Sequence, residues 1–218
     1  MDGHVQAMAD YRPCVLLDLD GTLVDSVFFH VVAWEAALRA SGHRVPMWRI
    51  HHAIGMGGER LRPWLLGAEP EDADEISADH QRRFLEHADE LQPTPGAAAL
   101  LDDLQRREIA FVIATSAEPE TTEALLRALG RDDFTVADSG DVGSPKPAPD
   151  LLLSAVADLG MSPGSATLVG DSPWDAEAAR RVGIRCLGVR CGGFGDHRLL
   201  HAGADDVVDD PRALVGRL

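Results

Sequence analysis

Short apolar segments alternate with segments of helical pattern over the second half of the chain, and this alternation restricts the fold more than any other feature. Strands that alternate with helices form a parallel sheet with helices on both faces. The sequence therefore predicts an α/β fold with a Rossmann-like parallel sheet at its core. The predicted strands are 109–114, 134–137, 166–169 and 184–189, and the predicted helices are 96–107, 118–129, 149–160 and 173–182.

One further strand is predicted near the start of the chain, in the apolar run that begins at Cys14 and leads into Asp18, and it is followed by a long segment without strands. Between residues 27 and 91 the apolar residues recur at helical spacing, and Pro93 and Pro95 then mark a linker or hinge. We therefore expect two domains. Residues 1–26 and 92–218 form the α/β core, and residues 27–91 form an inserted helical cap.

Two carboxylates, Asp18 and Asp20, stand where the first strand ends, and Gly21 follows as a turn residue. Ligands of open α/β sheets bind at the carboxyl ends of the strands, which is where these acids lie. Two nearby carboxylates repel each other unless a cation or a shared proton compensates, and Mg²⁺ prefers such oxygen ligands. An isolated pair of this kind is as consistent with ordinary loop acids as with a catalytic site.

Two other predicted strands also end in polar residues, and a single lysine precedes a predicted helix. Thr115 and Ser116 follow one strand, although such residues also begin helices as N-caps. Lys146 lies between prolines and is the one lysine among 20 basic residues, which suggests a site that needs an ammonium but also fits a solvated turn. Asp171 follows the strand 166–169, and Asp175 comes four residues later, at the start of a helix.

In chain order these residues resemble the four sequence motifs of the haloacid dehalogenase superfamily of phosphohydrolases. The helical insert after the first motif resembles the small α-helical cap of that family. The resemblance implies a Mg²⁺ cofactor and an aspartyl-phosphate intermediate. The roles that it implies are Asp18 as nucleophile, Asp20 as general acid/base, Thr115, Ser116 and Lys146 as phosphate-binding groups, Asp18, Asp20 (through its backbone carbonyl) and Asp171 as metal ligands, and Asp175 as support of the metal shell.

The resemblance further implies a Mg²⁺-dependent phosphatase of a small phosphorylated metabolite, such as phosphoglycolate or a sugar phosphate. Two alternatives stay open, namely a phosphosugar mutase and a catalytically silent phosphate-binding protein. The spacing of His30 and Trp34 resembles the β-phosphoglucomutase branch of the family. Gly58, however, stands where that mutase carries a phosphate-binding arginine, which favours a phosphatase.

The cap is expected to choose the substrate by closing over the active site. Its polar side chains and its glycine turn are the candidates for substrate contact, although several of them also fit a solvated surface or the packing of the cap. The candidates are His30, Arg49, His52, Gly58 and Arg60, together with Trp34, His51 and Arg62.

Composition narrows the partners. A formal net charge of −16 argues against a nucleic-acid partner or an anionic membrane, because both require a positive surface. No apolar run reaches the length of a membrane span, and Cys14, Cys186 and Cys191 fit neither a metal site nor a disulfide framework. We expect a cytoplasmic protein, either a monomer or a homodimer.

Overall fold

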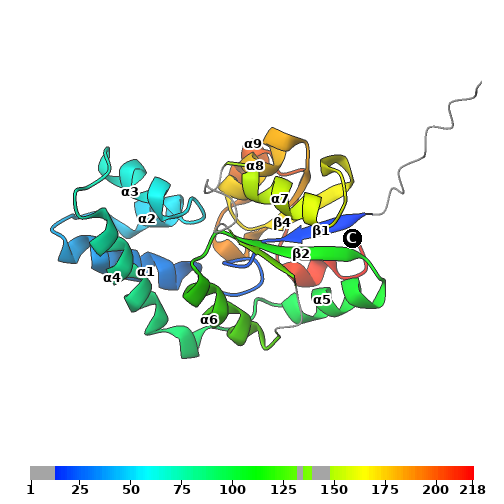
Figure 1. The fold of residues 1–218 in the computed structure, drawn as a ribbon, viewed down its shortest axis with the longest axis horizontal. Helices are drawn as coiled ribbons and strands as arrows, with labels where there is room; N and C mark the ends of the chain where they lie inside the picture. Colours follow the sequence, from blue (N-terminus) through cyan, green and yellow to red (C-terminus); the bar gives the residue numbers. More distant parts are fainter. Residues whose placement is uncertain (1–12, 132–134, 139–147) are drawn as a thin grey trace, which may run out of the picture.

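The structure, a computed structural model, describes residues 13–131, 135–138 and 148–218 (Figure 1). Its sheet has six strands in the order β3-β2-β1-β4-β5-β6, and every neighbouring pair is parallel. The predicted α/β fold is therefore confirmed. The strands are β1 (Cys14–Leu17), β2 (Ala110–Thr115), β3 (Val136–Asp138), β4 (Ala166–Gly170), β5 (Arg185–Val189) and β6 (Asp206–Val208).

Helices cover both faces of the sheet and also form a separate group beyond one end of it (Figure 1). The α-helices are α1 (Val27–Ala40), α2 (Met47–Ala53), α3 (Gly58–Leu66), α4 (Ala73–Leu85), α5 (Ala97–Arg106), α6 (Pro119–Leu129), α7 (Asp150–Asp158), α8 (Pro173–Val182) and α9 (Asp196–Ala202). The 3₁₀ helices among the described residues are η1 (Ala88–Glu90), η3 (Pro163–Ser165), η4 (Arg190–Gly192) and η5 (Pro211–Leu214). None of the described helices is long and apolar enough to cross a membrane.

The central strand β1 is buried on both faces, as its uninterrupted apolar sequence requires. Cys14 and Leu16 face one core cluster, which includes residues of α7, α8 and α9. Val15 and Leu17 face the other cluster, which includes residues of α5 and α6. Successive side chains of a strand point to opposite faces, so a single apolar strand holds both layers together.

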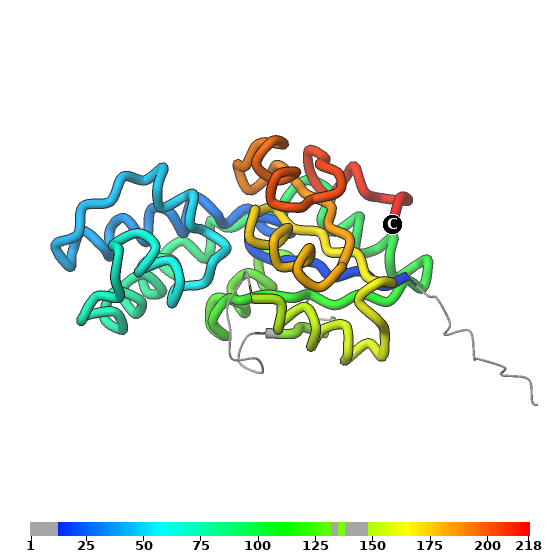
Figure 2. Tube along the Cα trace, turned by 90° about the horizontal axis from the view of Figure 1, so that it is seen from above, coloured from blue at the N-terminus to red at the C-terminus, as the bar shows by residue number. Residues whose placement is uncertain are grey.

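Helices α1 to α4 lie side by side beyond the carboxyl ends of the strands, and this helical segment is called the cap below (Figures 1 and 2). The cap has a hydrophobic cluster of its own, built around Trp34, Ile50 and Ile76. Phe84 on α4 belongs instead to a core cluster of the sheet, so the cap is also anchored to the core. The exact division of the chain into domains stays a prediction.

Two backbone segments connect the cap to the core, and they run next to each other. Val24 forms an isolated antiparallel bridge with Pro93. The N–H of Asp25 donates to the carbonyl of Gln92 at 2.9 Å, and the N–H of Thr94 donates to the carbonyl of Leu23 at 2.9 Å. The entry to and the exit from the cap are thus held at one place, beside the residues that follow β1.

Candidate active site

The carboxyl ends of the central strands bring together acids that are far apart in the sequence. Asp18 directly follows β1, and Asp171 directly follows the neighbouring strand β4. The N–H of Asp18 donates to the carbonyl of Val169 at 3.0 Å, which continues the pairing with β4 past the end of β1. Asp175, near the start of α8, completes a group of three carboxylates whose nearest oxygens lie within 4.8 Å of one another.

These three carboxylates suit a hard divalent cation. Asp18, Asp171 and Asp175 are 5%, 3% and 1% exposed, so water screens their mutual repulsion poorly. The hydroxyl of Thr22 donates to Asp18 Oδ2 at 3.1 Å, and the hydroxyl oxygen of Thr22 also lies 3.3 Å from Asp171 Oδ1. Three buried oxygen donors on a rigid sheet edge fit Mg²⁺, which is generally held by one or two carboxylates with water completing its shell.

Asp20 has different surroundings from Asp18, although the two are only two residues apart. Its Oδ1 accepts a hydrogen bond from the hydroxyl of Ser26 at 2.8 Å and lies 2.8 Å from Nε2 of His30. Nδ1 of His30 lies 3.1 Å from Nε2 of His80, and the His30 ring stacks on Phe84. The side chain of Asp20 therefore lies on the cap side of the site and is positioned by residues of α1 and α4.

The residues after β2 also lie at this edge of the sheet. Thr115 is buried, and its hydroxyl oxygen accepts a hydrogen bond from the N–H of Ala117 at 3.1 Å. Ser116 lines the cavity next to the acids, whereas Thr115 does not. Lys146 and the proline-rich segment around it lie outside the described residues.

Asp175 is positioned by the N-terminus of α8. Ser172 and Asp175 form a capping box, in which the N–H of Ser172 donates to Asp175 Oδ2 at 3.1 Å and the N–H of Asp175 donates to Ser172 Oγ at 3.3 Å. Such a reciprocal pair fixes both side chains at the start of a helix. The loop between β4 and α8 thus presents Asp171 and Asp175 in a fixed arrangement.

The loop after β5 contacts the same acids from the other side. Cys191 Sγ lies 3.0 Å from the carbonyl oxygen of Gly21, and burial together with the nearby charge of Asp171 raises the pKa of its thiol, so that it stays protonated. Nε2 of His51, on α2, lies 2.9 Å from the carbonyl oxygen of Gly192. This loop therefore connects the turn after β1 with the cap.

A cavity of about 560 Å³ opens between the acids and the cap. Its core side includes Asp18, Asp20, Asp171, Ser116 and Glu118, and its cap side includes His30, Trp34, Gly58, Glu59, Arg62, Asp74, Ser77, His80 and Gln81. A small metabolite fits this volume.

Some of the cap residues expected at the substrate line this cavity and others do not. His30, Gly58, Trp34 and Arg62 are among the lining residues, whereas Arg49, His52 and Arg60 are not. Arg49 lies over the ring of Trp64, and Arg60 is exposed. His52 contacts the core, because its carbonyl accepts a hydrogen bond from Arg198 at 3.4 Å. A contact of these three residues with substrate is therefore not supported by their positions.

Several residues of the site were not predicted from the sequence. Thr22 and Ser26 lie within the first motif, and their hydroxyls could have been recognised as donors to the two aspartates. Glu59, Asp74, His80 and Gln81 gave no signal, because nothing in their spacing distinguishes them from solvated residues of amphipathic helices.

Comparison with known proteins agrees with this geometry. The family described as haloacid dehalogenase-like hydrolase matches residues 13–183. The chain is 30% identical over 190 residues to the plasmid-borne protein CbbY of Cupriavidus necator, covering 78% of this chain and 75% of that protein. It is 31% identical over 215 residues to a phosphoglycolate phosphatase of Caulobacter vibrioides, with 92% and 90% covered.

Among solved structures, a hydrolase from Pseudomonas syringae superimposes with a TM-score of 0.92 at 35% identity, covering 94% of this chain and 97% of that one. The match therefore extends over both the sheet and the cap. Because the family model matches residues 13–183 of the 218, this chain is a member of the haloacid dehalogenase-like hydrolases.

Proposed function

We propose that the protein is a Mg²⁺-dependent phosphatase that hydrolyses the monoester of a small phosphorylated metabolite. The observation that carries this proposal is the difference between Asp18 and Asp20. Asp18 shares a buried cluster with Asp171 and Asp175, which suits a nucleophile next to a cation. Asp20 is turned toward the cavity and bonded to Ser26 and His30, which suits a group that transfers protons.

In the first proposed step, a carboxylate oxygen of Asp18 attacks phosphorus, and the bond between phosphorus and the leaving oxygen breaks. Asp20 gives its proton to that oxygen, which leaves as an alcohol. In the second step, Asp20 takes a proton from water while the water oxygen attacks the phosphorus of the aspartyl-phosphate. Inorganic phosphate leaves, and Asp18 and Asp20 return to their starting states. A positioned proton donor of this kind commonly contributes about 10²–10⁴-fold to the rate.

Asp18, Asp171 and the backbone carbonyl of Asp20 would hold the cation, with Asp175 in support. Bound there, Mg²⁺ supplies positive charge that offsets the charge of the phosphoryl oxygens. Hydroxyl and N–H groups of Thr115 and Ser116, at the end of β2, are suitable donors to the same oxygens. Lys146 would add an ammonium, as the family resemblance implies.

Phosphoglycolate phosphatase activity of one relative and the wider family support this reaction class. We also propose a cytoplasmic location. Cys14, Cys186 and Cys191 are free thiols, and thiols remain reduced in the cytoplasm. The proposed reaction makes no use of a second subunit, so either a monomer or a homodimer is compatible with it.

The test is phosphate release from a panel of phosphorylated metabolites and a generic aryl phosphate, with and without Mg²⁺. We expect release that requires Mg²⁺ and that is lost in Asp18→Asn. Asp25→Asn is the matched control, because Asp25 is an exposed carboxylate of the same segment and lies outside the cavity. Phosphate transferred between positions of a sugar, seen by ³¹P NMR without release, would instead identify a mutase, and folded protein without either reaction would contradict the proposal.

A further inference from the structure

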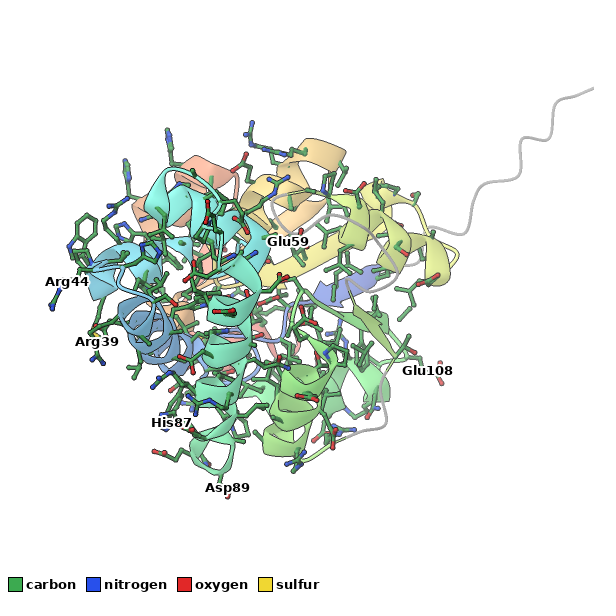
Figure 3. The ribbon with its side chains drawn as sticks, turned by 60° about the vertical axis from the view of Figure 1, so that its left-hand side comes forward. Arg39, Arg44, Glu59, His87, Asp89 and Glu108 are labelled. Carbon is green, nitrogen blue, oxygen red and sulfur yellow. The ribbon has the colours of Figure 1, made fainter. Side chains whose placement is uncertain are left out.

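The cap side of the cavity has an unusual balance of charge. Seven arginines lie between residues 27 and 91, and of these only Arg62 lines the cavity. Figure 3 shows Arg39 and Arg44 on the side of the cap that is turned away from the sheet, whereas Glu59 lies on the side next to it. The fold thus directs most of the positive charge of the cap into solvent.

The guanidinium of Arg62 already has acidic and polar partners. Its Nε and Nη2 donate to Glu69 Oε1 at 2.9 and 2.6 Å, and its Nη1 donates to the hydroxyl of Ser77. Arg62 is only 6% exposed, so these bonds are well shielded from water. The charge of Arg62 is therefore offset by Glu69, and little of it remains for a substrate.

Gly58, at the first turn of α3, provides no replacement for this charge. A Cβ atom added at Gly58 would lie 3.2 Å from Nη1 of Arg62, which is tighter than an ordinary contact. A large side chain such as arginine would have to displace the Arg62 guanidinium and the ring of Trp34 next to it. The buried position of Arg62 thus favours a glycine and leaves the start of α3 without a cation.

Besides Arg62, His30, His80 and the apolar residues, the side chains that line this surface are carboxylates and neutral polar groups. Glu59 and Asp74 line the cavity from the cap, and Glu118 lines it from the start of α6. Ser77 and Gln81, one turn apart on α4, add a hydroxyl and an amide. A second anionic group on the substrate would meet acids here, and two like charges 4 Å apart repel by about 1 kcal/mol in water and more near a protein surface.

We propose that the cap selects phosphomonoesters whose alcohol is uncharged and bears hydroxyl groups, and that Glu59 and Asp74 exclude alcohols with a second anionic group. This inference rests on the proposed phosphatase activity and specifies its substrate class. Hydroxyl groups would exchange hydrogen bonds with Ser77, Gln81 and the two carboxylates. The substrate named for the Caulobacter vibrioides relative, phosphoglycolate, carries a carboxylate and would be disfavoured in this chain.

Three six-carbon phosphomonoesters give the test, namely glucose 6-phosphate, whose ring alcohol is neutral, 6-phosphogluconate, whose open-chain alcohol carries a carboxylate, and glucosamine 6-phosphate, whose ring alcohol carries an ammonium. We expect kcat/KM for glucose 6-phosphate to exceed that for 6-phosphogluconate about tenfold, which corresponds to about 1.4 kcal/mol. The double variant Glu59→Gln, Asp74→Asn should narrow this ratio to about threefold by speeding the reaction of 6-phosphogluconate. The variant Glu75→Gln is the control, because Glu75 is exposed on α4 outside the cavity, and it should keep the full ratio.

The salt dependence separates charge from shape. If Glu59 and Asp74 act through their charge, the preference should weaken between about 0.05 and 0.5 M NaCl, because salt screens exposed charges. A ratio of kcat/KM values that changes neither with salt nor in the double variant would contradict the proposal. Turnover of 6-phosphogluconate as fast as that of glucose 6-phosphate, or faster, would also contradict it.

Binding to the Asp18→Asn variant, measured by calorimetry with the same three compounds, gives the order without turnover. We expect glucose 6-phosphate to bind more tightly than 6-phosphogluconate. If the native chain hydrolyses no phosphate ester, this order in the variant would support the substrate class while the missing turnover of the native chain contradicts the phosphatase activity. The reverse order would contradict the substrate class, whatever the activity with the aryl phosphate.

Discussion

Gly192 lies so close to Asp171 that a Cβ atom added to it would stand 1.7 Å from Oδ2 of the aspartate. The position therefore accepts no side chain unless Asp171 moves. His51 holds this glycine from the cap side, through the 2.9 Å contact between its Nε2 and the carbonyl oxygen of Gly192. The loop after β5 is thus part of the support of the acid cluster.

We predict that Gly192→Ala weakens Mg²⁺ binding about 10- to 100-fold, as loss of the groups that support metal ligands commonly does. Calorimetry of Mg²⁺ binding measures this without reference to turnover. Gly195→Ala is the matched control, since Gly195 has extended backbone and no heavy atom lies within 4 Å of its added Cβ. Unchanged affinity in Gly192→Ala would show that Asp171 is not a ligand or that the loop yields easily.

Mg²⁺ should also stabilise the folded protein, because the buried acids Asp18, Asp171 and Asp175 are close together only in the native state. A cation present at 100 times its dissociation constant adds about 2.7 kcal/mol to the free energy of unfolding. For a chain of this size that raises the melting temperature by roughly 5–10 °C. Thermal unfolding with Mg²⁺, with EDTA and with KCl of the same ionic strength measures the effect.

The rise in melting temperature should be largely lost in Asp171→Asn, which removes one of the three charges. The same rise in this variant and in the native chain would place the cation elsewhere. A rise with KCl alone would indicate a general effect of ionic strength.

His80 should make stability depend on pH. Enclosure, followed in importance by the charge of nearby His30, lowers the pKa of His80 well below its usual value. In the unfolded state His80 has an ordinary pKa near 6.5 and binds a proton below that pH, whereas in the folded state it stays neutral. The free energy of unfolding therefore falls as the pH falls below about 6.5. We expect the free energy of unfolding, measured with urea, to fall between pH 7.5 and 5.5 by about 1 kcal/mol more in the native chain than in His80→Phe.

His197→Gln is the control for this experiment, because His197 is exposed on α9 and far from the cap helices in the sequence. Its pH dependence should match that of the native chain. A His80→Phe variant with the native pH dependence would mean that other groups cause the acid sensitivity.

Phe84 connects the stability of the cap with the position of Asp20. It is fully buried in a core cluster of the sheet, and its ring stacks on His30 at a centroid distance of 3.8 Å. We predict that Phe84→Ala lowers the free energy of unfolding by about 3–5 kcal/mol, since it leaves a cavity. Denaturant unfolding measures this loss.

Phe84→Leu serves as the comparison, because leucine keeps most of the apolar volume and should cost less than about 2 kcal/mol. Leucine has no ring to stack on His30. The kcat of this variant should therefore fall even under conditions in which all of the protein is folded. Native kcat in Phe84→Leu would show that His30 keeps its position without the stacked ring.

Five strands of the sheet and the acids at its edge could be predicted from the sequence alone, whereas β6 was not predicted. Apolar runs of strand length, each followed by a helical segment, leave few alternatives to a parallel α/β sheet. The carboxyl ends of parallel strands share one edge, so Asp18 and Asp171 could be placed together before any coordinates. The hydroxyls of Thr22 and Ser26 lie within the same motif and could have been proposed as donors, but the oxygen that each contacts is known only from the structure.

The side chains that the cap directs into the cavity depend on tertiary packing and could not be predicted from the sequence. Helical spacing does not state which of several polar residues faces the cavity, because the rotation of α2, α3 and α4 is fixed by packing around Trp34, Ile50 and Ile76. That packing turns Arg49 and Arg60 away from the cavity and brings in Glu59 and Asp74 from separate helices. Local pattern thus specifies where the strands end, whereas contacts between distant helices specify the charge of the pocket above them.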